Sequence, residues 1–373
     1  MEGVDGWLRL VHAPGVGPVR TRELLDRFAT PAGIAAASSD QLSATRIPAP
    51  AIEVLRGKTT PAGIERDLEW AAGDDARHLI ALDDPRYPSA LAGIGDAPPV
   101  LYVQGDPQVL HLPGLAVVGT RHPTPAGRET AHDFARHLAG AGLVIASGLA
   151  LGIDGAAHEG ALAGGGITFA VAGTGLDRVY PARHADLARR IAQEGALVSE
   201  LPIGTRPSRE AFPRRNRILA GLGVGTLVVE AAVRSGSLIT ARLALEQGRE
   251  VFAIPGSIHN PVARGCHRLI RQGAKLVETG DDVLEEIAAL LGDKWLAPPA
   301  ADAGDGPADG RAASLADAPE YAHLLACIDW EPRGVDELAA ASGVDASAAA
   351  SMLLRLELEG VIRVAPGGLY QRA

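Results

Sequence analysis

The chain has 373 residues, which is enough for two or three domains around one sizeable core. Its two cysteines, Cys266 and Cys327, predict neither a disulfide framework nor a zinc site, and its first residues lack the pattern of a signal peptide, so we expect a cytoplasmic location. No apolar run is long enough to span a membrane. The formal net charge of −10 argues weakly against a nucleic-acid binder, although a local basic patch matters more than the total.

Residues 1–75 predict a small helical domain of the SAM or helix-hairpin-helix kind. Leu24, Leu25 and Phe28 recur at helical spacing after the segment PGVGP of residues 14–18. An apolar residue between two glycines is typical of a hairpin whose backbone N–H groups bind phosphate. A glycine-rich turn inside a helical bundle is the alternative, because the second half of the domain lacks a matching glycine pair.

Residues 76–291 predict a Rossmann-like α/β domain with a doubly wound, mostly parallel sheet. Short apolar runs alternate with helical patterns, which indicates right-handed βαβ crossovers. The runs lack a clean alternation of polar and apolar residues, as expected when helices cover both faces. We expect strands over residues 100–103, 115–118, 143–146, 168–172, 196–199, 225–230, 250–254 and 275–278. We expect helices from about residue 126 and over 154–163, 183–194, 215–221, 238–247, 264–272 and 281–291.

The C-terminal part divides into a linker and a small module. Residues 292–318 are rich in Ala, Gly, Pro and Asp and predict a flexible, acidic linker. Residues 319–373 predict a winged helix-turn-helix, with helices over 321–328, 335–341 and 346–359 and two strands around a turn at 366–368. Arg355 is the only basic residue of the third helix, so we favour protein contact or a structural role over DNA reading.

Two glycine-containing loops follow the first two strands of the predicted parallel sheet. In open α/β sheets ligands bind at the carboxyl ends of the strands, where these loops would lie side by side. Small residues let backbone N–H groups approach an anion, and Arg121 adds a fixed positive fork. The candidate anion-binding residues of these loops are Gly119, Thr120, Arg121, Ser147 and Gly148.

A second focus is residues 206–222, RPSREAFPRRNRILAGL, which are strongly basic within an acidic chain. Arginines interleaved with an aromatic ring suit single-stranded nucleic acid, because they offer charge for phosphates and a flat face for a base. A solvated basic face beside a helix opened by Pro213 is the alternative that this stretch alone favours. The candidate residues are Arg206, Arg209, Phe212, Arg214, Arg215, Asn216 and Arg217.

A third loop, with Ser235, Gly236 and Ser237, follows the strand that ends at Glu230 and opens a helix. Ser237 is the expected N-cap, and the free N–H groups of the first turn would form an anion pocket. An ordinary helix cap is the alternative. All three loops follow strands of one sheet, and this convergence is a stronger signal than any single loop.

Weaker candidates for catalysis also occur. Asp154 and His158 are four residues apart on one helix and could act as acid and base, but we favour a cap and its neighbour. No phosphate loop of the GxxxxGK[ST] type is present, and Gly173-Thr174-Gly175 lacks the third glycine of a dinucleotide loop.

Six motifs, in order, resemble the DNA-processing protein A family (DprA, also called Smf): VVGTRHPTPAG, ASGLALGIDGAAH, VAGTGLDRVYP, SELPIGTRPSREAFPRRNRILAGL, VVEAAVRSGSLITA and GREVFAIPGSIHNPVARGC. The resemblance implies a cytoplasmic, non-enzymatic protein that binds and protects single-stranded DNA during natural transformation. It further implies that the protein helps to load the RecA recombinase, dimerises through its α/β domain and uses no metal or cofactor.

The resemblance also assigns positions. Gly119 and Arg121 lie in the family's GSR loop, here GTR, and Arg209 falls on a DNA-contacting basic residue. Phe212 and residues 214–217 fall on the FPxRNR motif, and Ser235 and Ser237 on SGS. Two departures occur: Leu151 replaces an arginine and so removes one possible phosphate contact, and Cys266-His267 stand where the family often has RGTN.

A stripe on the helix over 281–291 is the candidate dimer interface. Its apolar residues recur at spacings of three and four and either pack on the sheet or associate with a second copy. The family resemblance favours a homodimer through Val283, Leu284, Ile287 and Leu291.

Two other functions remain open. Nucleotide hydrolases of the lysine-decarboxylase-like type share the fold and use a PGGxGTxxE loop. Gly225-Thr226 does precede Glu230 here, but the PGG is missing. A sequence-specific regulator acting through the winged helix is the third interpretation, for which the third helix offers poor support.

Overall fold

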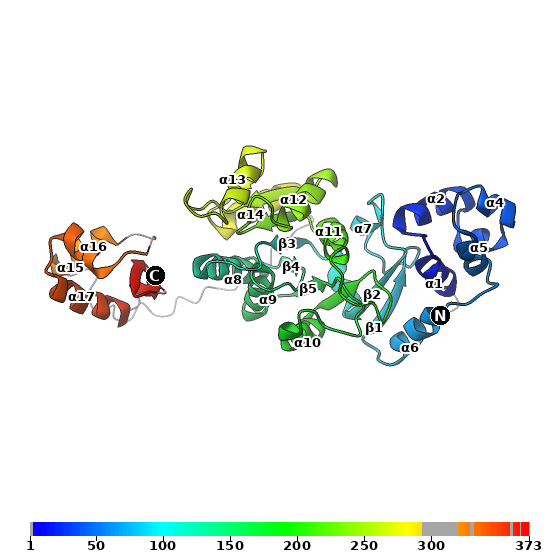
Figure 1. Ribbon diagram of the computed structural model, residues 1–373, viewed down its shortest axis with the longest axis horizontal. Coiled ribbons are helices and arrows are strands. Elements are labelled where there is room, and N and C mark those ends of the chain that lie inside the picture. Colours follow the sequence, from blue (N-terminus) through cyan, green and yellow to red (C-terminus); the bar gives the residue numbers. More distant parts are fainter. Residues whose placement is uncertain (1–2, 293–318, 329–331, 359–360, 366, 373) are drawn as a thin grey trace. The chain divides into compact units, whose positions relative to one another are not determined.

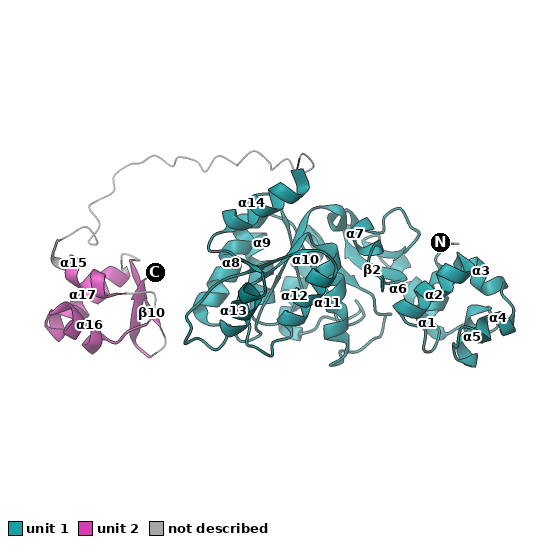
Figure 2. Cartoon of the chain, turned by 90° about the horizontal axis from the view of Figure 1, so that it is seen from above, with its two compact units in different colours: residues 1–298 teal, residues 299–373 magenta. Residues whose placement is uncertain are grey.

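The computed structural model describes residues 3–292, 319–328, 332–358, 361–365 and 367–372. It contains two compact units, residues 1–298 and 299–373, which are coloured separately in Figure 2. The predicted linker 292–318 lies, apart from Gly292, outside the described residues. No helix in the described ranges is long and apolar enough to cross a membrane.

The first unit is built on a mostly parallel sheet, as the sequence predicted. In the described chain the sheet has nine strands in the order β1-β2-β6-β5-β4-β3-β7-β8-β9. The pairs from β6 to β9 along this order are parallel, whereas β2 runs antiparallel to β6 and β1 antiparallel to β2. The strands are β1 (Arg77–Ala81), β2 (Val100–Gly105), β3 (Gly114–Val118), β4 (Val144–Ser147), β5 (Thr168–Val171), β6 (Ala196–Ser199), β7 (Gly225–Val228), β8 (Glu250–Ala253) and β9 (Lys275–Leu276).

Helices cover both faces of this sheet, and alternate strand residues enter different cores. Leu115 and Val117 of β3 pack with α8, α9 and α14, whereas Ala116 and Val118 pack in the core that includes α11, α12 and α13. Because both faces are buried, the strands are apolar on both sides. The helices are α7 (Ser89–Ala92), α8 (Pro125–Gly140), α9 (Ile153–Ala163), α10 (Ala185–Glu194), α11 (Ala211–Leu222), α12 (Ser237–Glu246), α13 (Arg264–Arg271) and α14 (Gly280–Leu291).

The predicted N-terminal helices are present, beyond the antiparallel edge of the sheet (Figure 1). They share a core with that edge, since Trp7, Leu8 and Trp70 cluster with Val100 and Tyr102 of β2. The helices are α1 (Asp5–His12), α2 (Pro18–Phe28), α3 (Pro31–Ala36), α4 (Ser39–Ser43), α5 (Ala49–Leu55) and α6 (Ala62–Ala72).

Val283 and Ile287, two of the four apolar residues in the α14 stripe, belong to the unit's own core, which corrects their assignment to a dimer interface. Val283 and Ile287 are fully buried, and Leu284 and Leu291 pack against the same core. The helix lies against α8 and begins with a capping box of Thr279 and Asp282. The buried part of the stripe therefore fits the alternative interpretation, in which the helix packs on its own domain.

The second unit has the predicted winged-helix elements. Its helices are α15 (Pro319–Cys327), α16 (Val335–Ser342) and α17 (Ala346–Leu358), and β10 (Ile362–Ala365) pairs antiparallel with β11 (Leu369–Arg372). Leu324, Leu338, Leu353 and Leu356 form its core. Arg355 is the one basic residue within α17, and it is exposed beside Leu354. This helix therefore presents little positive charge.

Candidate nucleic-acid interface

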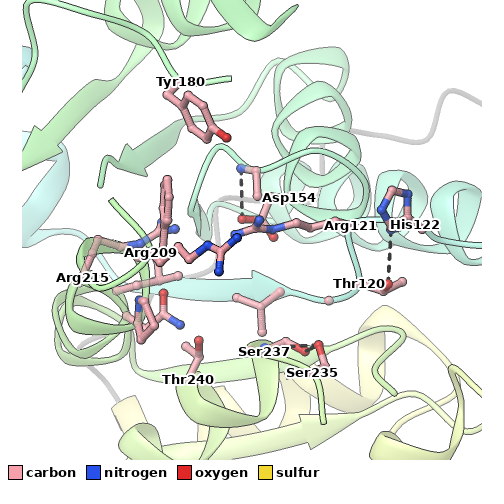
Figure 3. A pocket seen from close by; sticks show the side chains of 18 residues that line it. Thr120, Arg121, His122, Asp154, Tyr180, Arg209, Arg215, Ser235, Ser237 and Thr240 are labelled. Carbon is pink, nitrogen blue, oxygen red and sulfur yellow. Dashed lines mark hydrogen bonds between the residues drawn. The ribbon is translucent and has the colours of Figure 1, made fainter. Parts of the chain in front are cut away.

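A pocket of about 520 Å³ opens at the carboxyl ends of β3 and β7. The Arg121 loop, the basic stretch around Arg209 and the serine loop at 235–237 all line it, as their convergence predicted, whereas Ser147 and Gly148 do not. Figure 3 shows Tyr180 at the top of the view, Ser235 and Ser237 at the bottom, and Arg121 and Arg209 between them. The chemically distinctive lining residues are Gly119, Thr120, Arg121, His122, Asp154, Tyr180, Arg209, Phe212, Arg215, Asn216, Ser235, Gly236, Ser237 and Thr240.

Two exposed arginines supply the free charge of this pocket. Arg121 follows β3 directly, and Arg209 lies just before α11. Both side chains belong to exposed residues, and neither makes an ion pair with any residue that the structure describes. Arginines without an ion-pair partner in a concave site attract anions, and the buried carboxylate of Asp154 in the same lining offsets only part of the Arg121 charge.

An aromatic pair stands beside these charges. Phe212 is half-buried, and its ring centroid lies 5.4 Å from that of Tyr180, which is 48% exposed. The Arg121 guanidinium carbon lies 5.5 Å from the Phe212 centroid, within cation–π range. A Cβ at Gly173 would lie 2.8 Å from Cδ1 of Phe212, so the ring needs a glycine there. Sequence reasoning missed Tyr180, although it stands in one of the quoted motifs, VAGTGLDRVYP.

A third arginine, Arg215, lies buried at the pocket wall. Its Nη1 donates a hydrogen bond to the carbonyl of Val171 at 2.6 Å. Burial lowers the pKa of Arg215 to about 10, an effect that the charge of Asp154 opposes and the charge of Arg121 increases. The group therefore stays protonated at neutral pH and adds a fixed positive charge behind the pocket.

Asp154 holds the loop after β4 in place. Its Oδ2 accepts hydrogen bonds from the N–H groups of Gly148 at 3.1 Å and Ala150 at 3.3 Å. Leu149 between them has φ +60°, a strained conformation for a residue with a side chain. Burial raises the pKa of Asp154, while the charge of Arg215 and these hydrogen bonds oppose the rise.

His158 does not act with Asp154, because it contacts β5 instead. Its Nδ1 lies 2.7 Å from Oγ1 of Thr168, whose own proton goes to the carbonyl of Ile145. Nδ1 must therefore donate, and the ring is neutral. Burial, together with the charges of His184 and Arg215, lowers the pKa of His158 to about 3. The sequence favoured a helix cap and its neighbour; Asp154 is not the cap, because Gly152 is the N-cap of α9, but both residues do have structural contacts.

Ser147 and Gly148 support the pocket but do not line it, which corrects their predicted place. The Ser147 hydroxyl donates to the carbonyl of Val117 at 2.7 Å and is fully buried. Gly148 lies against the guanidinium of Arg215, which would collide with any Cβ. These two small residues thus make room for a buried arginine and leave no free group for a ligand.

Arg214 and Arg217 are also outside the pocket, in an ion-pair network. Arg217 has a side chain only 6% exposed, and its guanidinium pairs with Glu200 at 2.6 Å and Asp96 at 2.9 Å. Arg214, half exposed, pairs with Glu200 at 3.2 Å. The predicted phosphate contact of Arg217 is therefore replaced by a structural role, because its charge is buried and already compensated.

The serine loop at 235–237 does not have the predicted helix cap, because Ser237 is not the N-cap. Gly236 is the N-cap of α12 without a side-chain cap, and Ser237 is the first helical residue. The hydroxyl groups of Ser235 and Ser237 lie 2.7 Å apart. Both serines face the pocket, so the loop adds hydroxyl groups beside a helix N-terminus, which favours anions.

Glu230 is held away from the pocket. Its carboxylate accepts hydrogen bonds from the N–H of Thr124 at 2.9 Å and from its hydroxyl at 2.7 Å. Its carbonyl accepts from the N–H of Thr120 at 2.7 Å. Glu230 therefore fixes the Arg121 loop.

The two departures from the family pattern fall outside the pocket lining as well. Cys266 is buried, its thiol faces the carbonyl oxygens of Val228 and Val229, and burial raises its pKa to about 12. His267 contacts the carbonyl of Gly256 at 2.9 Å, and Leu151 is half-buried. In the described ranges no group of three or more His, Cys, Asp or Glu side chains could hold a metal ion.

Comparison with known proteins shows which family has this sequence and fold. The family model of DNA recombination-mediator protein A matches residues 78–288, and the DprA winged helix domain matches residues 306–368. The chain belongs to the DprA family. Among relatives, the protein Smf of Escherichia coli is 45% identical over 306 residues, covering 82% of this chain and 80% of that protein. The DNA processing protein DprA of Streptococcus pneumoniae is 49% identical over 203 residues, covering 54% of this chain and 72% of that protein.

Solved structures of the DprA family agree with the fold. The X-ray structure of DprA from Streptococcus pneumoniae matches with a TM-score of 0.67 and 36% identity, covering 75% of this chain and 97% of that one. DprA from Helicobacter pylori, solved in a study of its single-stranded DNA binding mode, matches with a TM-score of 0.51 and 32% identity. That match covers 54% of this chain and 93% of the other.

Proposed function

We propose that this DprA-family chain binds single-stranded DNA at the pocket, protects the strand and helps to load the RecA recombinase during natural transformation. The observation that carries the proposal is the pairing of charge free of ion pairs with an aromatic pair, the half-buried Phe212 and the exposed Tyr180. Arg121 and Arg209 have no ion-pair partner among the described residues; the Arg121 guanidinium lies over the Phe212 ring, and Tyr180 packs beside that ring. Phosphates and unstacked bases need these two kinds of group together.

A duplex fits this site less well. Its bases are stacked inside and cannot reach a ring that is recessed in a pocket, and α17 of the winged helix offers only Arg355 to a groove. We expect a hairpin-free oligonucleotide to bind more tightly than its duplex at one fixed salt concentration, measured by gel shift. Equal affinities would contradict the proposal. The salt must be fixed because phosphate binding depends steeply on it.

We expect no catalytic turnover at this site. Asp154, the carboxylate in its lining, holds one loop, and Glu230, which the hydrolase function would need, holds another. Incubation with nucleoside monophosphates, ATP or DNA should leave each unchanged. Hydrolysis that disappears in a Glu230→Ala variant would support the hydrolase function instead.

The proposal includes self-association. Val283 and Ile287 of α14 are buried in the unit, so a second copy would contact residues that remain exposed. β9 ends the sheet order, and its Leu276 is 45% exposed, so this edge has both apolar surface and unpaired backbone groups. A monomer mass by light scattering at micromolar concentration would contradict this part.

A further inference from the structure

A buried carboxylate on α6 joins three parts of the first unit that are far apart in the sequence. Asp67 is fully buried, and its Oδ2 accepts a hydrogen bond from the Tyr102 hydroxyl of β2 at 2.5 Å. The same oxygen lies 2.7 Å from Nε2 of His12 on α1. The other oxygen, Oδ1, accepts a hydrogen bond from the N–H of Ile203 at 2.9 Å. A buried carboxylate is tolerated when hydrogen bonds satisfy it in this way.

The hydrogen bond to Ile203 differs from the other two, because its donor lies in a loop and not in the N-terminal helices or in β2. Ile203 belongs to the loop after β6, which leads toward the pocket. A second contact from α6 supports it, since Nη1 of Arg66 reaches the carbonyl of Ile203 at 3.5 Å. The next N–H, of Gly204, donates to Oδ1 of Asp177 at 2.8 Å. Ile203 is thus bonded to α6, and Gly204 to Asp177 in the loop after β5.

The segment that follows carries Arg209. Residues 206–210 are all exposed, and they connect Thr205 to the start of α11. Thr205 closes the anchored loop, because its N–H and hydroxyl both donate to the carbonyl of Pro202, and its carbonyl accepts from Gly175. An exposed span of five residues is positioned by its two ends. One end is a helix, and the other is the loop that Asp67 holds.

We propose that Asp67 is a positioning residue for DNA binding: its bond to Ile203 fixes the start of segment 206–210, so that Arg209 reaches a phosphate at the pocket. The inference rests on the proposed function of that pocket. Asp67 itself is a buried residue of the N-terminal helix α6 and does not line the pocket. Supporting groups of this kind decide affinity, because a contact residue held loosely loses its geometry.

The test compares two ways of weakening the same carboxylate cluster. Asp67→Ala removes the acceptor of the Ile203 N–H, whereas Tyr102→Phe removes a neighbouring hydrogen bond and leaves that acceptor in place. At a temperature where melting curves show both variants folded, we expect Asp67→Ala to bind single-stranded DNA about threefold to tenfold more weakly. Its slope of log affinity against log salt should fall by up to about 0.7, the share of one phosphate contact. Tyr102→Phe should keep the wild-type affinity and slope.

Asp67→Asn provides a second variant if the alanine does not fold. It keeps the volume and an acceptor, but a bond to a neutral acceptor is roughly half as strong as one to a carboxylate. We expect the same changes at smaller size. Wild-type affinity in a folded Asp67→Ala or Asp67→Asn variant, or an equal loss in Tyr102→Phe, would overturn the proposal, because Asp67 would then only stabilise the fold.

A double-mutant cycle identifies Arg209 as the group through which Asp67 acts. The Asp67→Ala/Arg209→Ala variant should bind no more weakly than Arg209→Ala alone, since a group that is absent cannot be misplaced. Additive losses, or an Arg209→Ala variant with wild-type affinity, would overturn the proposal.

Hydrogen exchange separates this inference from the proposed function, because it needs no DNA. The amides of Ile203, Gly204 and Thr205 should exchange faster in Asp67→Ala than in Tyr102→Phe or wild type. Unchanged exchange would overturn the positioning role, whereas failure of the wild-type chain to bind DNA would overturn the proposed function alone.

Discussion

Two arginines from one basic stretch, Arg209 and Arg217, use their charge in opposite ways. Arg209 is exposed at the pocket and has no ion-pair partner among the described residues. Arg217 is 6% exposed and lies between Glu200 and Asp96. A free, hydrated guanidinium can exchange counterions for a phosphate, whereas a buried and compensated one can only stabilise the fold. Burial and pairing, and not residue type, therefore divide this stretch into a binding end and a structural end.

The largest effect should come from the structural end. Arg217→Ala leaves the buried carboxylate of Glu200 with only the half-exposed Arg214, and breaking a buried pair typically costs about 3–5 kcal/mol of unfolding free energy. Denaturant unfolding measures this cost, and Arg214→Ala serves as the matched control with a smaller loss. DNA affinity should stay at the wild-type value where the variant is folded. A stable Arg217→Ala variant with weak DNA binding would reverse our division.

At the binding end, the contributions of the Phe212 ring and the Arg209 charge should differ in how DNA affinity depends on salt. Phe212→Ala should cost about 1–3 kcal/mol of stacking with a nearly unchanged salt slope. Arg209→Ala should also weaken binding, but it should flatten that slope by about 0.7. Titrations at several salt concentrations measure both quantities, with a thermal melt of each variant. If Phe212→Ala lowered only the melting temperature, its ring would belong to the fold and not to the interface.

A smaller effect is expected in the pH dependence of stability, which tests whether the buried His158 is neutral. The pKa of His158 is about 3 in the folded chain and near 6.5 when unfolded, so its contribution to stability is complete above pH 6.5 and is lost as the pH falls toward 3. At pH 5.5 the loss is about 1.4 kcal/mol. His158→Asn keeps a donor for Thr168 and cannot titrate, so its stability should fall less between pH 7 and 5.5. Parallel pH profiles of the two proteins would contradict the buried, neutral ring.

Much of the fold could be predicted because its signals are local. Apolar runs ended by glycine gave the strands from β3 to β8 within a few residues, since each run is buried on both faces. β1 was missed, because RHLIA lies at an antiparallel edge in a stretch rich in turn residues. The assignment of Val283 and Ile287 in α14 to a dimer interface was wrong, because apolar periodicity shows that a helix buries one face and does not show what covers it.

The site could be predicted only at the level of loops. Parallel topology brings the ends of β3 and β7 together, so Arg121 and Ser235 meet as expected. The fate of each arginine depends on carboxylates distant in sequence, such as Asp96 and Glu200, which no spacing rule reveals. Tyr180 reaches the pocket from the loop after β5, and its sequence position alone carried no sign of this.

The most direct test of the central claim is the salt dependence of single-stranded DNA binding by an Arg121→Ala/Arg209→Ala variant. Arg242→Ala is the control, because that exposed arginine of α12 pairs with Glu246 and does not line the pocket. We predict that the double variant stays folded, binds more weakly and loses about 1.4 from the slope of log affinity against log salt, about 0.7 for each phosphate contact. The control should match the wild type. Full affinity with an unchanged slope in the folded double variant would contradict the claim that this pocket binds DNA.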